Sequence, residues 1–444
     1  MNNHSPFRDT IYALSSGALP SGVAVIRLSG PQVCDAISAL TGSIPPARRA
    51  VLRQLKDATG AILDQGLVLY FPNPASFTGE DCAEFHIHGG RAAVSAVLRA
   101  LSSLSGLRQA EAGEFTRRAF INGKVDLTGA EALADLISAD TESQRRLAIE
   151  NANGRQKELY DSWRSRLLRA RALLEAELDF SDEDDVPEQV SAVVFSALQD
   201  LTREIQTHID GFSAAEIIRD GFNVVLAGAP NVGKSSLLNA LAKREVAIVT
   251  DIPGTTRDLI EVTLDLNGIK VIVADTAGIR DTDDKVEKIG VERAIKAAKN
   301  ADLVLRLADM NTEFANTDRE LSDTPYLLVA TKSDIEENGS YGSQKFDHKI
   351  SVITGDGLEK LIKNISSRAQ AAIGASSGII PTRLRHVELL NSTLESILQA
   401  CKEDATELQA EQLRMASASL GKITGTIDVE ELLGVIFSEF CIGK

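Results

Sequence analysis

The sequence predicts a multidomain protein of mixed class, with an N-terminal α+β domain, a discontinuous helical domain and an α/β domain inserted into it. Short strand-like runs separated by Pro, Gly and Asn occupy the first 124 residues. Long stretches of helical spacing with almost no Pro or Gly follow from residue 128 and return after residue 382. Between them, short apolar runs alternate with helical segments, which is typical of a parallel sheet covered by helices.

Composition narrows the class of protein. The 444 residues carry a formal net charge of −16, which excludes a protein that coats nucleic acid through bulk positive charge. No run approaches the ~18 apolar residues of a membrane span, and Met1–Thr10 lacks the pattern of a signal peptide. The four Cys residues form no CxxC pair. We therefore expect a soluble, cytoplasmic protein that does not enter a membrane.

The element pattern sets four expected segments. Strands are expected at Gly22–Leu28, Gly66–Phe71 and Ala83–His88, followed by a helix over Arg91–Leu104. Residues 1–124 form the first domain, and residues 125–218 and 379–444 form the two parts of the helical domain. Residues 219–378 form the inserted α/β domain. We expect helices over Ala130–Ser138, Glu142–Asn151 and Gln156–Phe180, and from Thr382 to the end with an interruption over Gly421–Asp428.

A phosphate-binding loop opens the inserted domain. Gly228–Ser235 reads GAPNVGKS, follows a predicted strand over Phe222–Ala227 and precedes a predicted helix. Glycines let successive backbone N–H groups turn toward phosphate oxygens, and the helix adds its positive N-terminal end. Lys234 reaches the β- and γ-phosphates, and the Ser235 hydroxyl binds Mg²⁺.

Later motifs identify the nucleotide as GTP. Strands are predicted at Ile269–Ala274, Leu303–Ala308 and Tyr326–Ala330. Asp275-Thr276-Ala277-Gly278 ends the first of them and Thr331-Lys332-Ser333-Asp334 follows the last. A carboxylate at Asp334 accepts from both N1–H and N2–H₂ of guanine, which adenine does not offer. An amide-bearing Asn is usual where Thr331 stands, so we expect a weakened base pocket; Ser351–Gly357 lies where a second guanine loop would.

The segment Thr250–Asp258 (TDIPGTTRD) has the composition of a switch loop, in which Thr256 completes the Mg²⁺ shell only when γ-phosphate is present. Ile279 stands where Ras-like enzymes place a water-orienting Gln, so another group must supply that role. Nearby candidates are Arg280, Asp283, Asp284 and Glu287. The predicted nucleotide-binding set is Asn231, Val232, Gly233, Lys234, Ser235, Ser236, Thr250, Asp251, Ile252, Pro253, Gly254, Thr255, Thr256, Asp275, Thr276, Ala277, Gly278, Lys332 and Asp334.

With these motifs the chain resembles the tRNA-modification GTPases of the MnmE (TrmE) family. The resemblance also rests on Val23–Gly30, Phe77–Asp81, Gly113–Phe120 and the terminal Phe440–Lys444. It implies an N-terminal domain that binds a tetrahydrofolate derivative and forms a homodimer, and a Ras-like P-loop GTPase domain. It further implies that, with an FAD-dependent MnmG partner, the protein adds an aminomethyl-type group to carbon 5 of the wobble uridine of certain tRNAs.

Carried over by position, the resemblance assigns roles to particular residues. It implies a K⁺ ion that neutralises charge between the phosphates. Glu287 would be the catalytic glutamate that positions water, with Lys234 and Arg280 as further catalytic candidates. Mg²⁺ would bind to Ser235 and Thr256. The implied K⁺ ligands are Asn231, Thr250, Ile252 and Thr255, and the implied folate ligands are Arg27, Glu84, Lys124 and Lys444.

Some interpretations stay open. The resemblance places Cys441 near the implied folate site, where it is either a catalytic thiolate or simply a buried cysteine. His86 and His88 lack a nearby third ligand, which favours a polar, fold-supporting face over a metal site. A GTP-switched RNA- or ribosome-assembly factor is the alternative function, although no basic RNA-binding module is visible. A third hypothesis is a folate-dependent aminomethyl transferase whose GTPase domain is only regulatory.

Overall fold

The computed structural model describes residues 7–179, 190–229, 231–248, 261–275, 299–309, 324–335, 345–374 and 378–427, and six residues between 433 and 443. Its contacts divide the chain into two compact units. One consists of Met1–Ala134, Ala152–Ser191 and Ser396–Lys444, and the other of Asp135–Asn151 and Ala192–Glu395. The four domain limits expected from the sequence stay a prediction.

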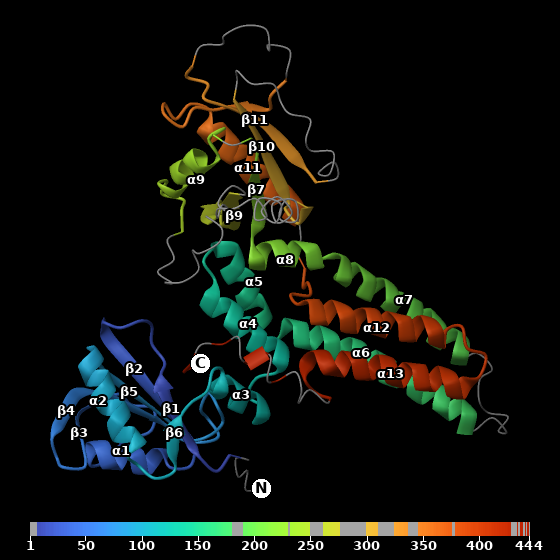
Figure 1. Ribbon diagram of the computed structural model, residues 1–444. Helices are drawn as coiled ribbons and strands as arrows, with labels where there is room; N and C mark the ends of the chain where they lie inside the picture. Colours follow the sequence, from blue (N-terminus) through green and yellow to red (C-terminus); the bar gives the residue numbers. More distant parts are fainter. Residues whose placement is uncertain are drawn as a thin grey trace, which may run out of the picture. The chain divides into compact units, whose positions relative to one another are not determined.

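A six-stranded sheet forms the N-terminal part of the chain (Figure 1). Its strand order is β3-β4-β5-β2-β1-β6, antiparallel except for the β1–β6 pair. The strands are β1 Thr10–Leu14, β2 Ser21–Ser29, β3 Val51–Lys56, β4 Ile62–Phe71, β5 Cys82–Gly89 and β6 Leu107–Gln109. The expected strands at 22–28, 66–71 and 83–88 are confirmed.

Alternation along β2 separates a core face from a polar face. Ala24, Ile26 and Leu28 are fully buried and belong to one apolar cluster with residues of α1 (Val33–Thr41) and α2 (Arg91–Ser102). Successive side chains of a strand point to opposite faces, so Arg27 lies on the other face of the sheet. The expected helix over 91–104 is confirmed by α2.

The end of the chain returns to this N-terminal sheet. Ala112 and Ile442 form an antiparallel bridge, and the Ser15 hydroxyl donates to the Gly443 carbonyl at 2.8 Å. Gly113, with φ +66, precedes α3 (Glu114–Ile121), and a Cβ atom there would lie 2.5 Å from the Phe437 carbonyl oxygen. A side chain at residue 113 would therefore separate the C-terminal residues from the first domain.

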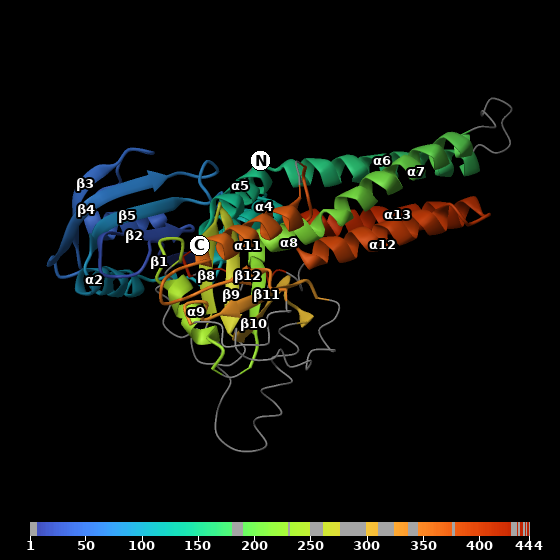
Figure 2. The same ribbon diagram turned by 90° about the horizontal axis from the view of Figure 1, so that it is seen from above.

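Long helices form the helical part. They are α4 Leu127–Ser138, α5 Glu142–Ala152, α6 Arg155–Asp179, α7 Val190–Asp210, α8 Phe212–Asp220, α12 Leu384–Ala400 and α13 Thr406–Thr424. Helices α6 and α13, far apart in sequence, pack side by side (Figures 1 and 2). The helices expected over 130–138, 142–151 and 156–180 are confirmed.

The expected interruption within Gly421–Asp428 is confirmed, but it begins four residues later than expected. Helix α13 continues to Thr424 and ends at Gly425, whose φ is +80. Gly421 lies inside the helix, and a Cβ atom there would come within 2.7 Å of the Ile427 side chain. This glycine permits close packing. A second break, which was not expected, falls over residues 401–405.

The second sheet is mostly parallel, as expected. Its order is β12-β11-β10-β7-β9-β8, and only β8 pairs antiparallel. The strands are β7 Phe222–Ala227, β8 Glu261–Leu266, β9 Ile269–Asp275, β10 Leu303–Asp309, β11 Tyr326–Thr331 and β12 His348–Lys349. Helices α9 (Lys234–Ala242) and α11 (Leu358–Ile373) contribute to its core. Parallel strands end at one edge of a sheet, where ligands of α/β folds bind.

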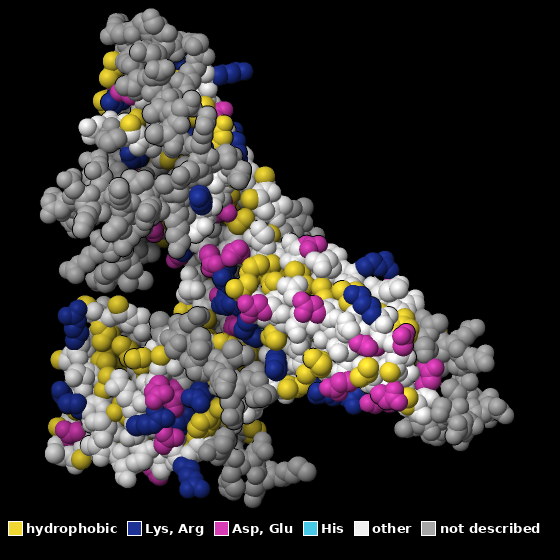
Figure 3. Space-filling model, turned by 45° about the vertical axis from the view of Figure 1, so that its right-hand side comes forward, with side chains coloured by type: hydrophobic (Ala, Val, Ile, Leu, Met, Phe, Trp, Pro, Cys, Tyr) yellow, Lys and Arg dark blue, Asp and Glu magenta, His cyan; other side chains and the backbone are white. Residues whose placement is uncertain are grey.

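Charged side chains of both signs are interspersed on the surface of the helical part in Figure 3. Many form pairs three or four residues apart, such as Arg171 with Glu175 and Arg414 with Glu411. None of the described helices combines the length and apolar character that crossing a bilayer requires.

A buried histidine lies close to the point where the chain leaves the inserted domain. His208 of α7 is 6% exposed, and its Nδ1 atom hydrogen-bonds the Ile379 carbonyl at 2.8 Å. Burial lowers the pKa of His208 to about 4, against the opposing effect of that hydrogen bond, and the charge of His386 lowers it further. The imidazole is therefore neutral in the folded protein at neutral pH.

We expect His208 to make the protein sensitive to acid. In the unfolded chain the imidazole takes up a proton as the pH falls through 6.5, whereas the folded protein resists until about 4. Between pH 6.5 and about 4 the unfolded state therefore binds more protons than the folded state. The free energy of unfolding is highest above pH 6.5 and falls by about 3 kcal/mol as the pH drops through this range. In urea unfolding, the free energy of unfolding of His208→Gln should depend much less on pH over this range. This dependence is called the slope below. The exposed His88→Gln is the control, and an unchanged slope in His208→Gln would contradict the assignment.

Candidate functional site

The phosphate loop joins β7 to α9 and has the backbone that its glycines predict. Gly228 has φ +149 and Gly233 has φ +101, and Asn231 adopts φ +63 between them. A Cβ atom on Gly228 would lie 2.4 Å from the Leu307 carbonyl oxygen, so only glycine fits there. Residues in such conformations let a loop curl so that its backbone N–H groups turn inward, which forms a cradle for an anion.

Two side chains at the start of α9 complete this cradle. Lys234 is 6% exposed, and its Nζ atom donates to the carbonyls of Gly228 and Ala229 at 2.7 and 2.9 Å. Ser235 donates from Oγ to Oδ2 of Asp275 at 2.7 Å, and Asp275 is fully buried at the end of β9. A hydroxyl and a carboxylate this close offer the hard oxygen ligands that Mg²⁺ prefers.

The residues expected to read the base follow β11. Lys332 has φ +60, and its Nζ atom contacts Asp309 Oδ2 at 2.7 Å. Asp334 accepts a hydrogen bond of 2.6 Å from the hydroxyl of the buried Ser351. The predicted second guanine loop therefore lies beside Asp334 and fixes the direction of its carboxylate.

Changing Asp334 should change the base that binds. Asp334→Asn replaces one acceptor oxygen with a donor, which matches the C2 carbonyl of xanthine better than the C2 amino group of guanine. We expect GDP affinity to fall at least about 100-fold and XDP affinity to rise, because a polar pocket rejects a mismatched donor strongly. Calorimetric titration with both nucleotides measures this, and Glu359→Gln, a change at an exposed residue in the first turn of α11, is the control. If Asp334→Asn still preferred GDP to XDP as strongly as the unmodified protein, Asp334 would not be the residue that recognises the base.

A second polar site lies on the open face of the N-terminal sheet. Arg27 of β2 and Glu84 of β5 are direct cross-strand partners, with Arg27 Nη2 at 3.0 Å from Oε1. His86 Nε2 lies 3.0 Å from the other oxygen of Glu84. Burial alone would raise the pKa of Glu84, but the hydrogen bond from His86 and the charge of Arg27 outweigh it and lower that pKa. Glu84 is therefore an oriented carboxylate in a half-buried position.

Two aromatic rings lie beside Arg27, and Lys124 packs against Gly79, two residues from one of these rings. The Arg27 guanidinium lies 5.8 Å from the Phe77 ring centre and 5.9 Å from that of Phe115. The stem of Lys124 packs against Gly79, where a Cβ atom would lie 3.1 Å from Lys124 Cε. Phe77 is 42% exposed, so a flat, partly polar ligand would find both a ring face and a carboxylate here.

Comparison with known proteins decides the family. The MnmE helical domain family matches residues 127–441, and the family of the GTP-binding protein TrmE N-terminus matches residues 10–124. A tRNA modification GTPase MnmE of Mesorhizobium japonicum is 56% identical over 98% of this chain and 99% of its own length. That of Brucella anthropi is 53% identical over the full length of both chains. The chain belongs to the tRNA modification GTPase MnmE family.

Among solved structures, the G domain of the T. maritima FeoB iron transporter matches 33% of this chain and 98% of its own length. Its sequence identity is 30% and its TM-score is 0.25. The resemblance stated from sequence motifs is confirmed by the two MnmE families and by the full-length relatives.

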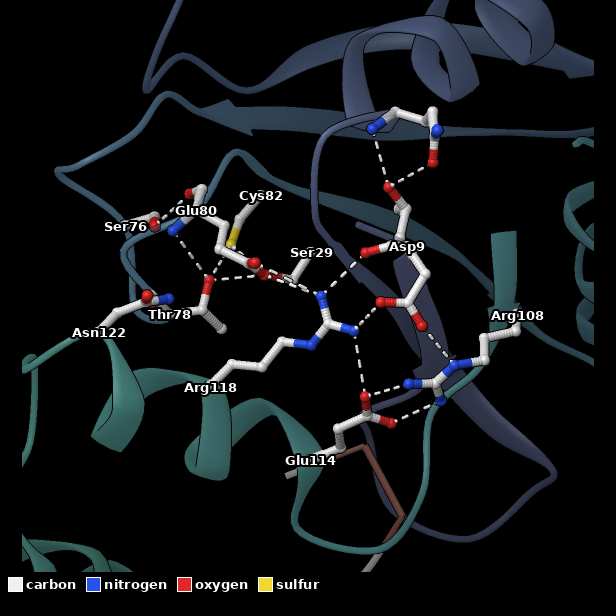
Figure 4. A network of polar contacts seen from close by, with 12 residues as sticks. Asp9, Ser29, Ser76, Thr78, Glu80, Cys82, Arg108, Glu114, Arg118 and Asn122 are labelled. Carbon is white, nitrogen blue, oxygen red and sulfur yellow. Dashed lines mark hydrogen bonds and ion pairs between the residues drawn. The ribbon is translucent and has the colours of Figure 1, made fainter. Parts of the chain in front are cut away.

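Residues from three motifs that mark the MnmE family in this sequence form a buried polar network (Figure 4). Arg118 is fully buried and donates from Nη1 to Glu80 at 3.2 Å and from Nη2 to Glu114 at 3.1 Å. Asp9 accepts from the same guanidinium at 2.9 Å. Ser29 donates to Glu80 at 2.6 Å. These motif residues hold the N-terminal domain together.

Several predicted residues lie outside the described parts of the chain, and their roles stay predictions. They are Thr250, Asp251, Ile252, Pro253, Gly254, Thr255, Thr256, Thr276, Ala277, Gly278, Arg280, Glu287, Cys441 and Lys444. The structure does bring together Lys234, Ser235 and Asp275 at one edge of the sheet, and Arg27 with Glu84 at the second site.

Sequence reasoning missed His86 as a member of the second site. The available signal was the two-residue period of β5, which places Glu84 and His86 on one face. It also missed the link from Ser351 to Asp334, since the loop that carries Ser351 is short and irregular. A hydroxyl at the first position of a predicted guanine loop was the signal for that link.

Proposed function

We propose that this member of the MnmE family is a K⁺-dependent GTPase that works with an FAD-dependent MnmG partner. Together they would add an aminomethyl-type group to carbon 5 of the wobble uridine of certain tRNAs, with a tetrahydrofolate derivative as the one-carbon donor. Family membership makes the chain a GTP hydrolase of tRNA modification. The observation that best supports GTP hydrolysis is the phosphate loop, in which the Lys234 ammonium group donates to the carbonyls of Gly228 and Ala229.

The described residues have clear tasks in hydrolysis. Loop N–H groups and Lys234 bind the phosphates and stabilise the charge that develops on them. Ser235, together with Thr256, would hold Mg²⁺, and Asp275 would hold its water shell; the ion supplies a Lewis acid for the transferred phosphoryl group. Asp334, oriented by Ser351, selects guanine.

Potassium dependence is proposed from Asn231. Its side chain leaves the phosphate loop from a left-handed backbone, φ +63, and an amide oxygen is a suitable ligand for an alkali ion. Thr250, Ile252 and Thr255 would provide further oxygens, and Glu287 would position the water in place of the absent glutamine. Hydrolysis by the full chain should be at least about tenfold faster in K⁺ than in Na⁺, the order of effect of one preorganised charge.

Asn231→Ala tests this assignment. It should abolish the difference between the two salts while leaving GDP binding intact, and Asn239→Ala, on the far turns of α9, is the control. Equal, slow rates of the unmodified protein in both salts would overturn the K⁺ mechanism.

Folate binding is proposed for the second site, with Arg27, Glu84, Lys124 and Lys444. Glu84 would accept the paired N–H donors of a pterin, and the lysines would pair with folate carboxylates. Because Arg27 is bound to Glu84, it would act on the pterin by holding that carboxylate in place. We propose a homodimer for the active protein and a cytoplasmic location. A catalytic Cys441 remains part of this proposal.

Mass spectrometry of wobble nucleosides tests the whole reaction. Cells lacking this protein should accumulate unmodified uridine, and the wild-type gene should restore the modification. Unaltered nucleosides in those cells would remove the wobble-uridine role and favour the GTP-switched assembly factor. In that event, ribosome profiles of these cells should show immature subunits. Under the main proposal the profiles should be normal.

A further inference from the structure

We propose that Thr331 is a positioning residue that fixes the phosphate loop to the strand carrying the base-recognition residues, and that it gives no hydrogen bond to the base. Thr331 is the last residue of β11 and is 2% exposed. Its hydroxyl donates to the Val232 carbonyl at 2.7 Å and lies 3.2 Å from the Ala308 carbonyl. The side chain thus joins the phosphate loop to the ends of β10 and β11.

The contact controls the direction of one phosphate-binding group. In a trans peptide the carbonyl and the next N–H point in opposite directions. The hydroxyl of Thr331 holds the Val232 carbonyl on its own side of the loop, so the N–H of Gly233 points away from Thr331. Gly233 has φ +101 and little intrinsic preference for one peptide orientation, so an external hydrogen bond is needed to fix it.

The number of protons on the Thr331 side chain limits the hydrogen bonds that it can donate to a nucleotide. A hydroxyl carries a single proton, whereas an asparagine amide carries two N–H donors. The short 2.7 Å contact commits the proton of Thr331 to Val232. An amide at this position could serve the loop with one N–H and the acceptor N7 of guanine with the other. In this chain guanine recognition therefore rests on Asp334, held by Ser351, and on the Lys332 stem.

The unmodified protein provides the first test. Calorimetry should give dissociation constants for GDP and 7-deaza-GDP that agree within about twofold, because no donor faces N7. Thr331→Asn should keep the loop contact and gain a donor, so that 7-deaza-GDP binds about fivefold more weakly than GDP. A preference of the unmodified protein for GDP above about threefold would overturn the claim that the hydroxyl is committed to the loop.

A pair of variants tests the positioning role. Thr331→Val keeps the shape but leaves the buried Val232 carbonyl without its donor, and should weaken GDP and IDP binding equally, by about tenfold. Thr331→Ser restores the hydroxyl and should recover most of the affinity. The ratio between GDP and IDP reports on Asp334 and should stay constant. Unchanged affinity in a folded Thr331→Val protein, or failure of Ser to rescue it, would overturn the proposal.

Discussion

Arg118→Ala should be the most destabilising single change in the N-terminal domain. Its guanidinium is fully buried and binds Asp9, Glu80 and Glu114. Glu114 and Asp9 keep their ion pairs with Arg108, so the loss falls mainly on the carboxylate of Glu80, which is only 3% exposed. Breaking a buried ion pair from one side costs about 3–5 kcal/mol, because the remaining charge has lost its partner.

Hydrogen exchange of the full chain measures this effect where it occurs. Amides of β1 and β2 should exchange faster in Arg118→Ala by a factor of more than about 100, which corresponds to about 3 kcal/mol. Arg146→Ala is the matched control, since Arg146 is 71% exposed and its partner Glu142 also binds Arg145. The control should change stability by less than about 1 kcal/mol. Equal exchange in the two variants would show that the network contributes little to the fold.

The same network shows where sequence reasoning stops. The motif residues Glu80, Glu114 and Arg118 have the polar composition of a ligand site, and only long-range packing shows that they bind one another. A charged residue in a sequence does not reveal whether its partner is a ligand or a distant side chain. Here Asp9 and Arg118 are 109 residues apart.

Local signals were sufficient for most elements. The strands β2 and β5 follow from periodicity because each has one strongly buried face. Strand β3 was not predicted, since its residues are mostly exposed or half-buried at the sheet edge. In the phosphate site, Lys234 and Ser235 were predictable because their function depends on contiguous backbone. The Thr331–Val232 and Ser351–Asp334 contacts join residues that only the folded sheet brings together.

Lys234→Ala should have the largest effect on activity. The ammonium group is buried and is held by two carbonyls of the phosphate loop, so it lies where phosphate charge develops. Loss of one preorganised donor typically costs about 10²–10³ in turnover, and a full cation at a phosphoryl group belongs at the upper end. Lys243→Ala, at the exposed C-terminal end of α9, is the matched control and should retain full GTP turnover.

The Lys234→Ala protein also separates two accounts of the tRNA reaction. If hydrolysis drives modification, the variant should bind tRNA normally and yet leave the wobble uridine unmodified, because the substitution removes a group that acts on the nucleotide phosphates. If the GTPase domain were only regulatory, modification by the variant would continue at a reduced but measurable rate. Thermal unfolding of the variant must match the wild type for either result to count, since Leu237, Leu238 and Leu241 of the same helix belong to the core of the inserted domain.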